Sequence, residues 1–154
     1  MKVGATTAGS VEESAAAGPD EAFGLTLFAE GVNVPMILDT GSQLSFASYE
    51  WFESHDLVKG ADETPLLSMR IATGGGRTDV TVLPLARDWI ISIDDSTTAR
   101  CFFQVYLILN WSESPFAEVS DVGVLGRQAL RDNGFRLEIR LTDEYPLRRI
   151  FGPL

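Results

Sequence analysis

Asp39, Thr40, Gly41 and Ser42 form the stretch of this sequence whose residue types are best suited to chemistry. They follow the apolar run 34–38, which is typical of a buried strand, so a carboxylate stands at the tip of a strand that has no evident structural use for it. An unpaired carboxylate is costly to bury unless its pKa shifts or it shares a proton with a partner. Asp39 is therefore either part of a surface turn or a group held in place for acid–base chemistry.

A glycine-rich turn between the apolar stretches 66–72 and 78–85 is the second candidate for a functional role. Three consecutive glycines allow a backbone to move and to approach a ligand closely. The turn region contains Ala72, Thr73, Gly74, Gly75 and Gly76. A phosphate-binding loop is not favoured, because no Gly-Lys-Ser/Thr sequence with a following helix is present. A loose hairpin turn is the simpler alternative.

The elements that would position these residues are mostly short strands separated by turn residues, which predicts an all-β fold with one or two short helices. Ser48 is placed to cap a short helical turn, and Gly134 is placed to end a second one over 127–133. The turn at 30–33 makes the first two strands a hairpin. The predicted strands span 25–28, 34–38, 44–46, 66–72, 78–85, 89–93, 101–109, 122–126 and 135–141.

The composition changes at both ends of the chain. Residues 1–22 are rich in Ala, Gly, Ser and Glu and predict a flexible N-terminal tail or linker. Residues 23–142 carry the strand pattern and are long enough to form one domain. Residues 143–154 form a C-terminal extension that is apolar enough to pack and is a candidate strand for a dimer interface.

Composition also excludes several classes of function. The net charge of -10 disfavours both nucleic acid and anionic membranes as partners, since each is bound through a basic surface. No apolar run is long enough to span a membrane and no signal peptide is visible, so a cytoplasmic location is expected, either as a separate protein or as a fragment of a larger polyprotein. The single cysteine, Cys101, excludes an internal disulfide. No cofactor or metal site is predicted.

The remaining chemically capable side chains have structural explanations. His55, the only histidine, follows an amphipathic helical turn and is expected at the surface, and Cys101 is expected in the core. Asp94 and Asp95 predict a hairpin turn, because no further ligands are spaced to hold a metal with them. The tryptophans are expected in the core or in a groove wall. They are Trp51, Trp89 and Trp111.

Three segments together resemble a known family. The run 37–42, Ile-Leu-Asp-Thr-Gly-Ser, resembles the catalytic motif of aspartic proteases. The run 124–130, Val-Leu-Gly-Arg-Gln-Ala-Leu, resembles the segment near the end of retroviral proteases, and a glycine-tipped hairpin over 69–76 lies between the two, where that family has its flap. The chain therefore resembles the retropepsin-like aspartic proteases from about residue 23 to residue 141. It departs from them at Gln128, where an acidic residue is common, in the long loop 110–121, and after residue 141.

The resemblance implies a closed acid-protease barrel with one Asp-Thr-Gly lobe and one flap hairpin per chain, active as a homodimer. It implies that Asp39 and its symmetry mate form a catalytic dyad that hydrolyses peptide or protein substrates without a cofactor. Thr40 would bond across the two-fold axis, Gly41 would leave room for backbone, and Ser42 would bond the outer carboxylate oxygen. The supporting strand would be formed by Leu125, Gly126 and Arg127, with Gly126 passing behind the catalytic loop where a side chain would clash.

Two other functions remain open on the sequence. The chain could be a catalytically inactive, dimerising adaptor with a peptide groove, since a fold does not by itself determine a function. It could also be the protease domain of a retroelement polyprotein, which would make that polyprotein its substrate. The intact Asp-Thr-Gly-Ser run favours an enzyme over an inactive adaptor.

Overall fold

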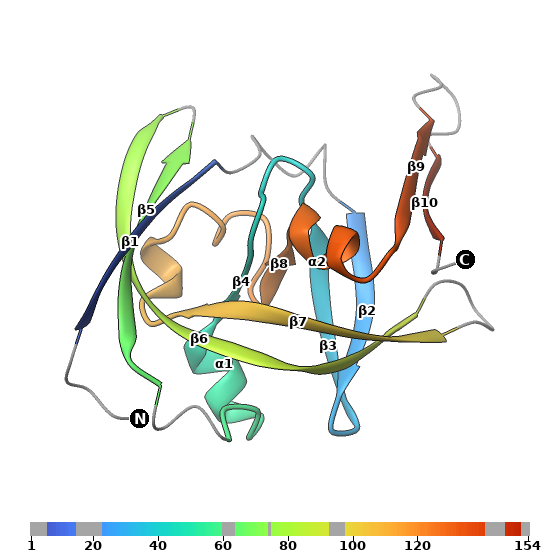
Figure 1. Ribbon diagram of the computed structural model, residues 1–154, viewed down its shortest axis with the longest axis horizontal. Helices are drawn as coiled ribbons and strands as arrows, with labels where there is room; N and C mark the ends of the chain where they lie inside the picture. The colour runs from blue at the N-terminus through green and yellow to red at the C-terminus, as the bar shows by residue number, and fades with distance from the viewer. Residues whose placement is uncertain are drawn as a thin grey trace.

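The computed structural model describes residues 6–14, 23–59, 64–73, 75–92, 98–140 and 147–151. Within them the chain is mainly β, with short helical segments on the outside of the sheet (Figure 1). The strands are β1 (Thr6–Ser14), β2 (Phe23–Ala29), β3 (Val32–Leu38), β4 (Ser45–Ser48), β5 (Leu66–Thr73), β6 (Gly76–Ser92), β7 (Thr98–Ile108), β8 (Gly123–Leu125), β9 (Arg136–Arg140) and β10 (Leu147–Phe151). The helical segments are α1 (Tyr49–Ser54), the 3-10 turn η2 (Trp111–Glu113) and α2 (Arg127–Asp132).

Strands β2 to β8, apart from β5, close into a barrel. Their hydrogen-bonded order is β6-β2-β3-β8-β4-β7, and β7 pairs in turn with β6, which completes the ring. Closure satisfies the backbone groups that an open sheet would leave at its edges. The predicted mainly β fold with a closed barrel and two short helices is therefore confirmed.

The strand β6 belongs both to the barrel and to a hairpin that leaves it (Figure 1). Its first residues pair with β5, and from Val82 onward it pairs with β7. The sequence predicts two strands here, at 78–85 and 89–93, and this prediction is wrong, because the strand runs without a break through Arg87 and Asp88. Polar residues do not interrupt a strand in which only alternate side chains need to be buried.

Both helices are capped as predicted. The Ser48 hydroxyl accepts a hydrogen bond from the Trp51 N–H at 3.2 Å, at the start of α1. At the end of α2, Gly134 has a φ of 72°, and the Phe135 N–H donates to the Leu130 carbonyl oxygen at 2.9 Å. Glycine adopts this left-handed conformation without steric cost, which explains why the helix ends here.

The side chain of Asn133 ties the end of α2 to β7. Its Oδ1 accepts from the Phe102 N–H at 2.8 Å, while its Nδ2 donates to the Phe102 carbonyl at 2.9 Å and to the Ala129 carbonyl at 2.8 Å. The amide thus pairs with Phe102 as the backbone of a neighbouring strand would. No sequence pattern distinguishes this residue from an ordinary polar residue at a helix end.

Replacing Asn133 with Ala is expected to lower the free energy of unfolding by roughly 1–3 kcal/mol, because three hydrogen bonds are lost together and each is worth about 1 kcal/mol net. Urea unfolding measures the change. The control is Asn33→Ala on the exposed side of β3, which is expected to change stability much less. Equal effects of the two substitutions would contradict the structural role of Asn133.

Buried side chains form two clusters. One fills the barrel and includes Trp89 and Phe103, whose rings stack with centroids 5.0 Å apart. The other lies where the β5–β6 hairpin meets β4, β7, β8 and the segment around η2. It contains Phe46, Met69, Ile71, Val80, Val82, Ile108, Trp111, Phe116 and Val124. The predicted loop 110–121 is therefore anchored in the core by Trp111 and Phe116.

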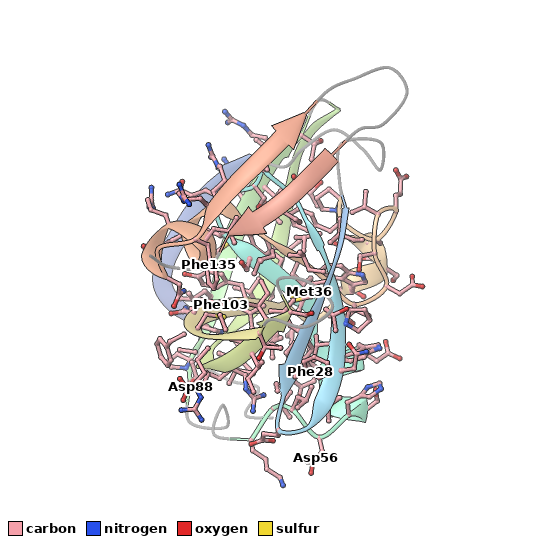
Figure 2. The ribbon with its side chains drawn as sticks, turned by 90° about the vertical axis from the view of Figure 1, so that its right-hand side faces the viewer. Phe28, Met36, Asp56, Asp88, Phe103 and Phe135 are labelled. Atoms are coloured by element: carbon pink, nitrogen blue, oxygen red, sulfur yellow. The ribbon has the colours of Figure 1, made fainter. Side chains whose placement is uncertain are left out.

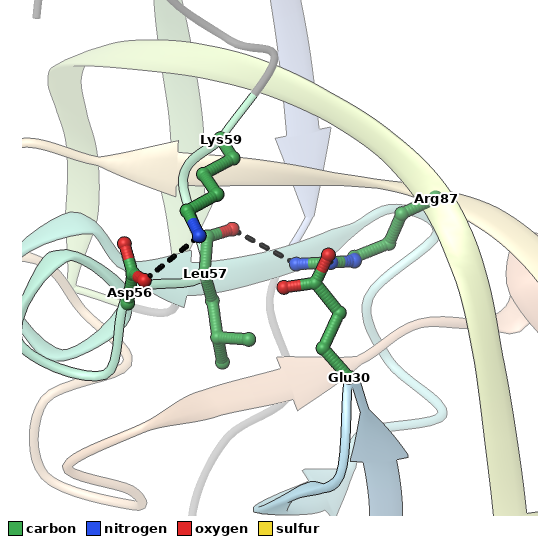
Figure 3. Close-up of polar contacts among 5 residues, drawn as sticks. All are labelled: Glu30, Asp56, Leu57, Lys59 and Arg87. Atoms are coloured by element: carbon green, nitrogen blue, oxygen red, sulfur yellow. Dashed lines mark hydrogen bonds and ion pairs between the residues drawn. The ribbon is translucent and has the colours of Figure 1, made fainter.

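Arg87 fixes the β2–β3 turn against the segment that follows α1 (Figure 3). Its Nη1 donates to the Leu57 carbonyl at 2.8 Å, and its Nη2 lies 3.3 Å from Glu30 Oε1. Glu30 and Gly31 both have positive φ, of 50° and 77°, so the turn is a two-residue hairpin turn rather than the longer one predicted over 30–33.

The two chain ends carry strands outside the barrel. Within the predicted tail 1–22, β1 pairs in parallel with β5; the rest of that stretch lies outside the described residues. Backbone pairing needs no apolar side chains, so composition alone could not reveal this strand. Within the predicted extension 143–154, β10 pairs antiparallel with β9 in a separate sheet (Figure 2). Phe135 lies just below this sheet and is buried in the barrel cluster.

Candidate functional site

The Asp39 loop begins where β3 ends. Strands β3 and β8 pair in parallel, with Leu38 opposite Leu125. The Asp39 N–H extends this ladder by donating to the Leu125 carbonyl at 3.0 Å. Because a central barrel strand delivers the carboxylate, its position is set by the core rather than by a free loop.

The chain turns sharply after Asp39. The Ser42 N–H donates to the Asp39 carbonyl oxygen at 3.1 Å, and the Gly41 N–H donates to Asp39 Oδ1 at 3.1 Å. The second bond makes this the Asx-type turn that sequence reasoning left as the structural alternative. The Asp39 residue is nevertheless only 5% exposed, unlike a surface turn. A carboxylate can accept about four hydrogen bonds, so the bond from Gly41 does not use up its acceptor capacity.

The start of α2 supports this loop from behind. The Arg127 N–H donates to the Ser42 carbonyl and the Gln128 N–H to the Gln43 carbonyl, both at 2.9 Å. The first N–H groups of a helix have no partner within it, so the loop carbonyls satisfy them. The Arg127 side chain is exposed, and its contribution to the support comes from its backbone. The Gln128 side chain is half-buried.

Gly126 lies where the chain passes closest to the loop. A Cβ atom at this position would be 2.7 Å from the Gln43 carbonyl oxygen and still closer to that of Leu44. Its φ of -92° and ψ of 174° are extended values open to any residue, so space and not conformation requires glycine. The Gly126 N–H donates to the Ser45 hydroxyl at 2.9 Å.

Thr40 and Ser42 are the loop residues predicted to act on the carboxylate or on a second subunit. Thr40 is half-buried, and its bond across a two-fold axis stays a prediction, since one chain is described. The Ser42 hydroxyl donates to the Leu44 carbonyl at 2.7 Å. A hydroxyl has one hydrogen, so the predicted bond from Ser42 to the Asp39 carboxylate requires it to turn away from Leu44, and that bond also stays a prediction.

The glycine-rich turn closes the hairpin of β5 and β6, which the sequence resemblance predicts to be a flap and which is called the flap hairpin below. Pairing extends to Thr73 opposite Gly76, and the Thr73 hydroxyl both accepts from the Gly75 N–H and donates to the Gly76 carbonyl, each at 3.2 Å. Gly76 has a φ of 129°, which favours glycine. Ala72 is half-buried, and Gly74 lies outside the described residues.

The flap hairpin and the Asp39 loop are connected through the second core cluster. Buried Met69 and Ile71 of β5 pack in the same cluster as Val124, which directly precedes the supporting segment 125–127. Ile37, two residues before Asp39, packs against this cluster as well. The β5 strand of the flap hairpin, the strand that leads into Asp39 and the strand that precedes Gly126 thus pack in one apolar cluster.

The other candidate residues have structural surroundings. His55 is exposed, stacks on the Trp51 ring with centroids 3.8 Å apart, and its Nδ1 lies 2.8 Å from the Trp51 carbonyl oxygen. Trp89 and Trp111 are buried in the core. Asp94 and Asp95 lie outside the described residues. Across the described residues, no three His, Cys, Asp or Glu side chains are grouped to hold a metal ion, and no helix is both long and apolar enough to cross a membrane.

Cys101 is buried in β7, and burial raises the pKa of its thiol to about 11, with a smaller contribution from the negative charge of Asp88. We expect the folded protein to react slowly with a disulfide reagent at pH 8 and the denatured protein to react at once, because the thiolate is the reactive form. Following absorbance with and without denaturant measures this. Equal rates would show that the thiol is accessible.

The Cys101 thiol also makes the free energy of unfolding depend on pH between about 9 and 11. Below pH 9 it is protonated in both states; as pH rises from 9 to 11 the unfolded thiol ionises while the folded one does not. Stability therefore falls, by about 2 kcal/mol from this group at pH 11. Burial raises the pKa of Tyr106 too, so wild type is compared with Cys101→Ser, which should lose stability less steeply.

Three residues that support the loop were not predicted. They are Gln43, Leu44 and Ser45, which contribute two carbonyl oxygens and one hydroxyl to the contacts with Ser42, Gly126 and Gln128. Of the three, only Ser45 could have been indicated by the sequence, because it is a polar residue next to the apolar Phe46 and Ala47. The carbonyl groups give no signal in the sequence, because every residue carries one.

The comparisons with known proteins find similarity among solved structures only. No protein-family model matches the sequence, and a search of curated proteins finds no match. Among solved structures, the chain is similar to the crystal structure of a retropepsin-like aspartic protease from Rickettsia conorii. The two are 14% identical, the match covers 89% of this chain and 90% of the other, and the TM-score is 0.45.

Proposed function

We propose that this protein is an aspartic endopeptidase that hydrolyses peptide bonds in extended polypeptides, with Asp39 from two identical subunits as its catalytic dyad. The supporting observation is that Asp39, a residue only 5% exposed, stands at the tip of a barrel strand on a loop bonded to both β8 and α2. Burying a carboxylate costs free energy of folding, and buried ionisable groups are concentrated at functional sites. The resemblance of residues 37–42 to the catalytic motif of aspartic proteases points to peptide hydrolysis as that function.

The proposed reaction needs one base and one acid. One carboxylate of the dyad takes a proton from a water molecule as the water attacks the peptide carbonyl carbon, and the protonated partner donates to the carbonyl oxygen. The first carboxyl group then gives its proton to the amide nitrogen as the C–N bond breaks, and the partner takes back a proton from the diol oxygen. Two carboxylates at close range share one proton because they do not readily ionise together, so the pair holds both groups ready. The flap hairpin would close over the peptide and exclude other water.

The dyad requires a second chain, because the sequence contains one Asp-Thr-Gly. The β9–β10 sheet offers a surface through which the second chain would bind. A two-stranded sheet standing beyond the barrel offers outer edges that the same hairpin of a second copy could pair with across a two-fold axis. Such an interface is self-complementary, as a symmetric dimer requires.

The proposal predicts a dimer that cleaves peptides with a bell-shaped pH dependence on the acid side of neutral, because both the doubly protonated and the doubly ionised dyad are inactive. Sedimentation measures the dimer. A peptide library assayed from pH 3 to pH 8, with and without a statine-type inhibitor, measures the reaction. A rate that rises steadily with pH and ignores the inhibitor would contradict the proposal.

An inactive, dimerising peptide-binding module is the second candidate. It is favoured by the Asx-type turn, which gives Asp39 a structural role without catalysis. This module would bind library peptides and leave them intact. An enzyme and a binding module are therefore separated by product analysis on peptides that demonstrably bind.

A further inference from the structure

The flap hairpin has an edge that is already occupied. The open end of the eight-stranded sheet is β1, and its neighbour β5 pairs with β6 on its other side. The β1–β5 register runs through Val11 opposite Met69 to Ser14 opposite Ala72, which is next to the flap turn. An extended peptide that adds a strand to the β5 side of the flap hairpin would use this same edge, since β6 takes the other edge of β5.

Strand β1 ends beside the flap hairpin, and strand β2 begins beside the Asp39 loop. Ser14 pairs with Ala72 of the flap hairpin, and Phe23 pairs with Leu38, the residue before Asp39. A substrate held between the flap and Asp39 has to reach the same two places.

In the described structure β1 is held by its backbone pairing with β5. Its sequence, Thr-Thr-Ala-Gly-Ser-Val-Glu-Glu-Ser, has one large apolar residue, Val11. It pairs in parallel, which is slightly less stable per residue than antiparallel pairing, and its register is irregular between Thr6 and Ser10. A peptide with apolar side chains offers the same backbone groups and additional burial, so it can displace β1.

We propose that β1 is an intramolecular competitor of substrate, which occupies the peptide-binding edge of the flap hairpin until a better strand replaces it. This rests on the proposed function and adds regulation to the same site. A protein whose binding edge is open only part of the time binds peptide more weakly by that fraction. Weakening β1 therefore lowers KM and leaves kcat nearly unchanged, because the dyad itself is not altered.

The first test is the full-length double variant Val11→Pro, Glu12→Pro. Consecutive N–H groups of a strand point to opposite sides, so one of the two prolines removes a bond to β5. The matched control, Val11→Ala, Glu12→Ala, loses the same side chains and keeps both N–H groups. We expect KM for a peptide substrate to fall roughly tenfold in the proline variant, with kcat within about twofold, and little change in the control.

The second test locks β1 in place. Ser10 and Ser68 lie opposite each other in the register, at a spacing that suits a disulfide between neighbouring strands. The variant Ser10→Cys, Ser68→Cys should lose peptide cleavage and affinity for a statine-type inhibitor when oxidised, and regain both with dithiothreitol. Each single-cysteine variant serves as a control for the added thiol.

Calorimetry of inhibitor binding distinguishes the competitor proposal from the proposed catalytic function. If the lock and the prolines change inhibitor affinity but no variant cleaves peptide, β1 is a competitor and the proposed catalytic function is wrong. If the oxidised lock binds inhibitor as tightly as wild type, or if no variant including the proline one binds it, the competitor proposal is overturned. An inhibition by β1 that grows with protein concentration would also overturn it, because β1 would then act between molecules.

Discussion

Replacing Asp39 with Asn is expected to abolish peptide hydrolysis, lowering kcat roughly 10³-fold or more, while fold and dimer persist. An amide can neither take the proton of the attacking water nor share one with its partner. The substitution is otherwise conservative, because the Asn Oδ1 can still accept the Gly41 N–H that Asp39 accepts at 3.1 Å. Asp39→Ala also removes the catalytic group but loses that bond as well, so it should be less stable than Asp39→Asn.

Mixed dimers test whether two chains build one site. If wild type and Asp39→Asn chains are unfolded together and refolded in equal amounts, random pairing leaves about one quarter of the dimers with two carboxylates. At the same total protein concentration, activity should then fall to about one quarter of the value for wild type alone. A fall to about one half would mean that each chain works by itself, and full cleavage by purified Asp39→Asn would rule out the catalytic assignment.

Replacing Gly126 with Ala is expected to be the most damaging single-methyl change in the described part of the loop support. The new Cβ would stand 2.7 Å from the Gln43 carbonyl oxygen and closer to that of Leu44, and these are backbone atoms that cannot rotate away. Overpacking of this kind costs about 1–3 kcal/mol and sometimes more. Relief of the clash would also move residues 43–44, and with them the hydrogen bonds that hold the Asp39 loop.

The matched control is Gly24→Ala in β2, where a Cβ would meet nothing within 4 Å. Thermal unfolding and peptide cleavage should be nearly unchanged in the control. In Gly126→Ala both should fall, with cleavage falling further than the loss of folded protein explains. A Gly126→Ala protein as stable and active as the control would show that residues 43–44 can move freely.

The regions in which local signals agree were predicted well. The apolar run ending at Asp39 is β3, Ser48 caps α1, and Gly134 ends α2. In each case the structure follows from interactions within a few residues: burial of a short run, a hydroxyl at a helix start, or a residue without a side chain. The closed barrel also matches what the family resemblance implied.

The two largest errors concern pairing between distant segments. Two predicted strands are one, β6, because β5, β7 and β2 in turn provide partners along its length. Part of the predicted tail is β1, because β5 had an edge to pair with. Neither partner is visible from the strand's own sequence, since a backbone N–H is the same in every residue except proline.

The sequence by itself determined that a carboxylate follows an apolar strand and belongs to an Asp-Thr-Gly-Ser turn, because residue identity and apolar pattern are local properties. Only the tertiary structure decided what surrounds that turn. It places α2 behind the loop, leaves no room for a Cβ atom at Gly126, and joins the flap base to Val124 and Ile37 in one cluster. These relations depend on which strands meet when the barrel closes, and that is a property of the whole chain.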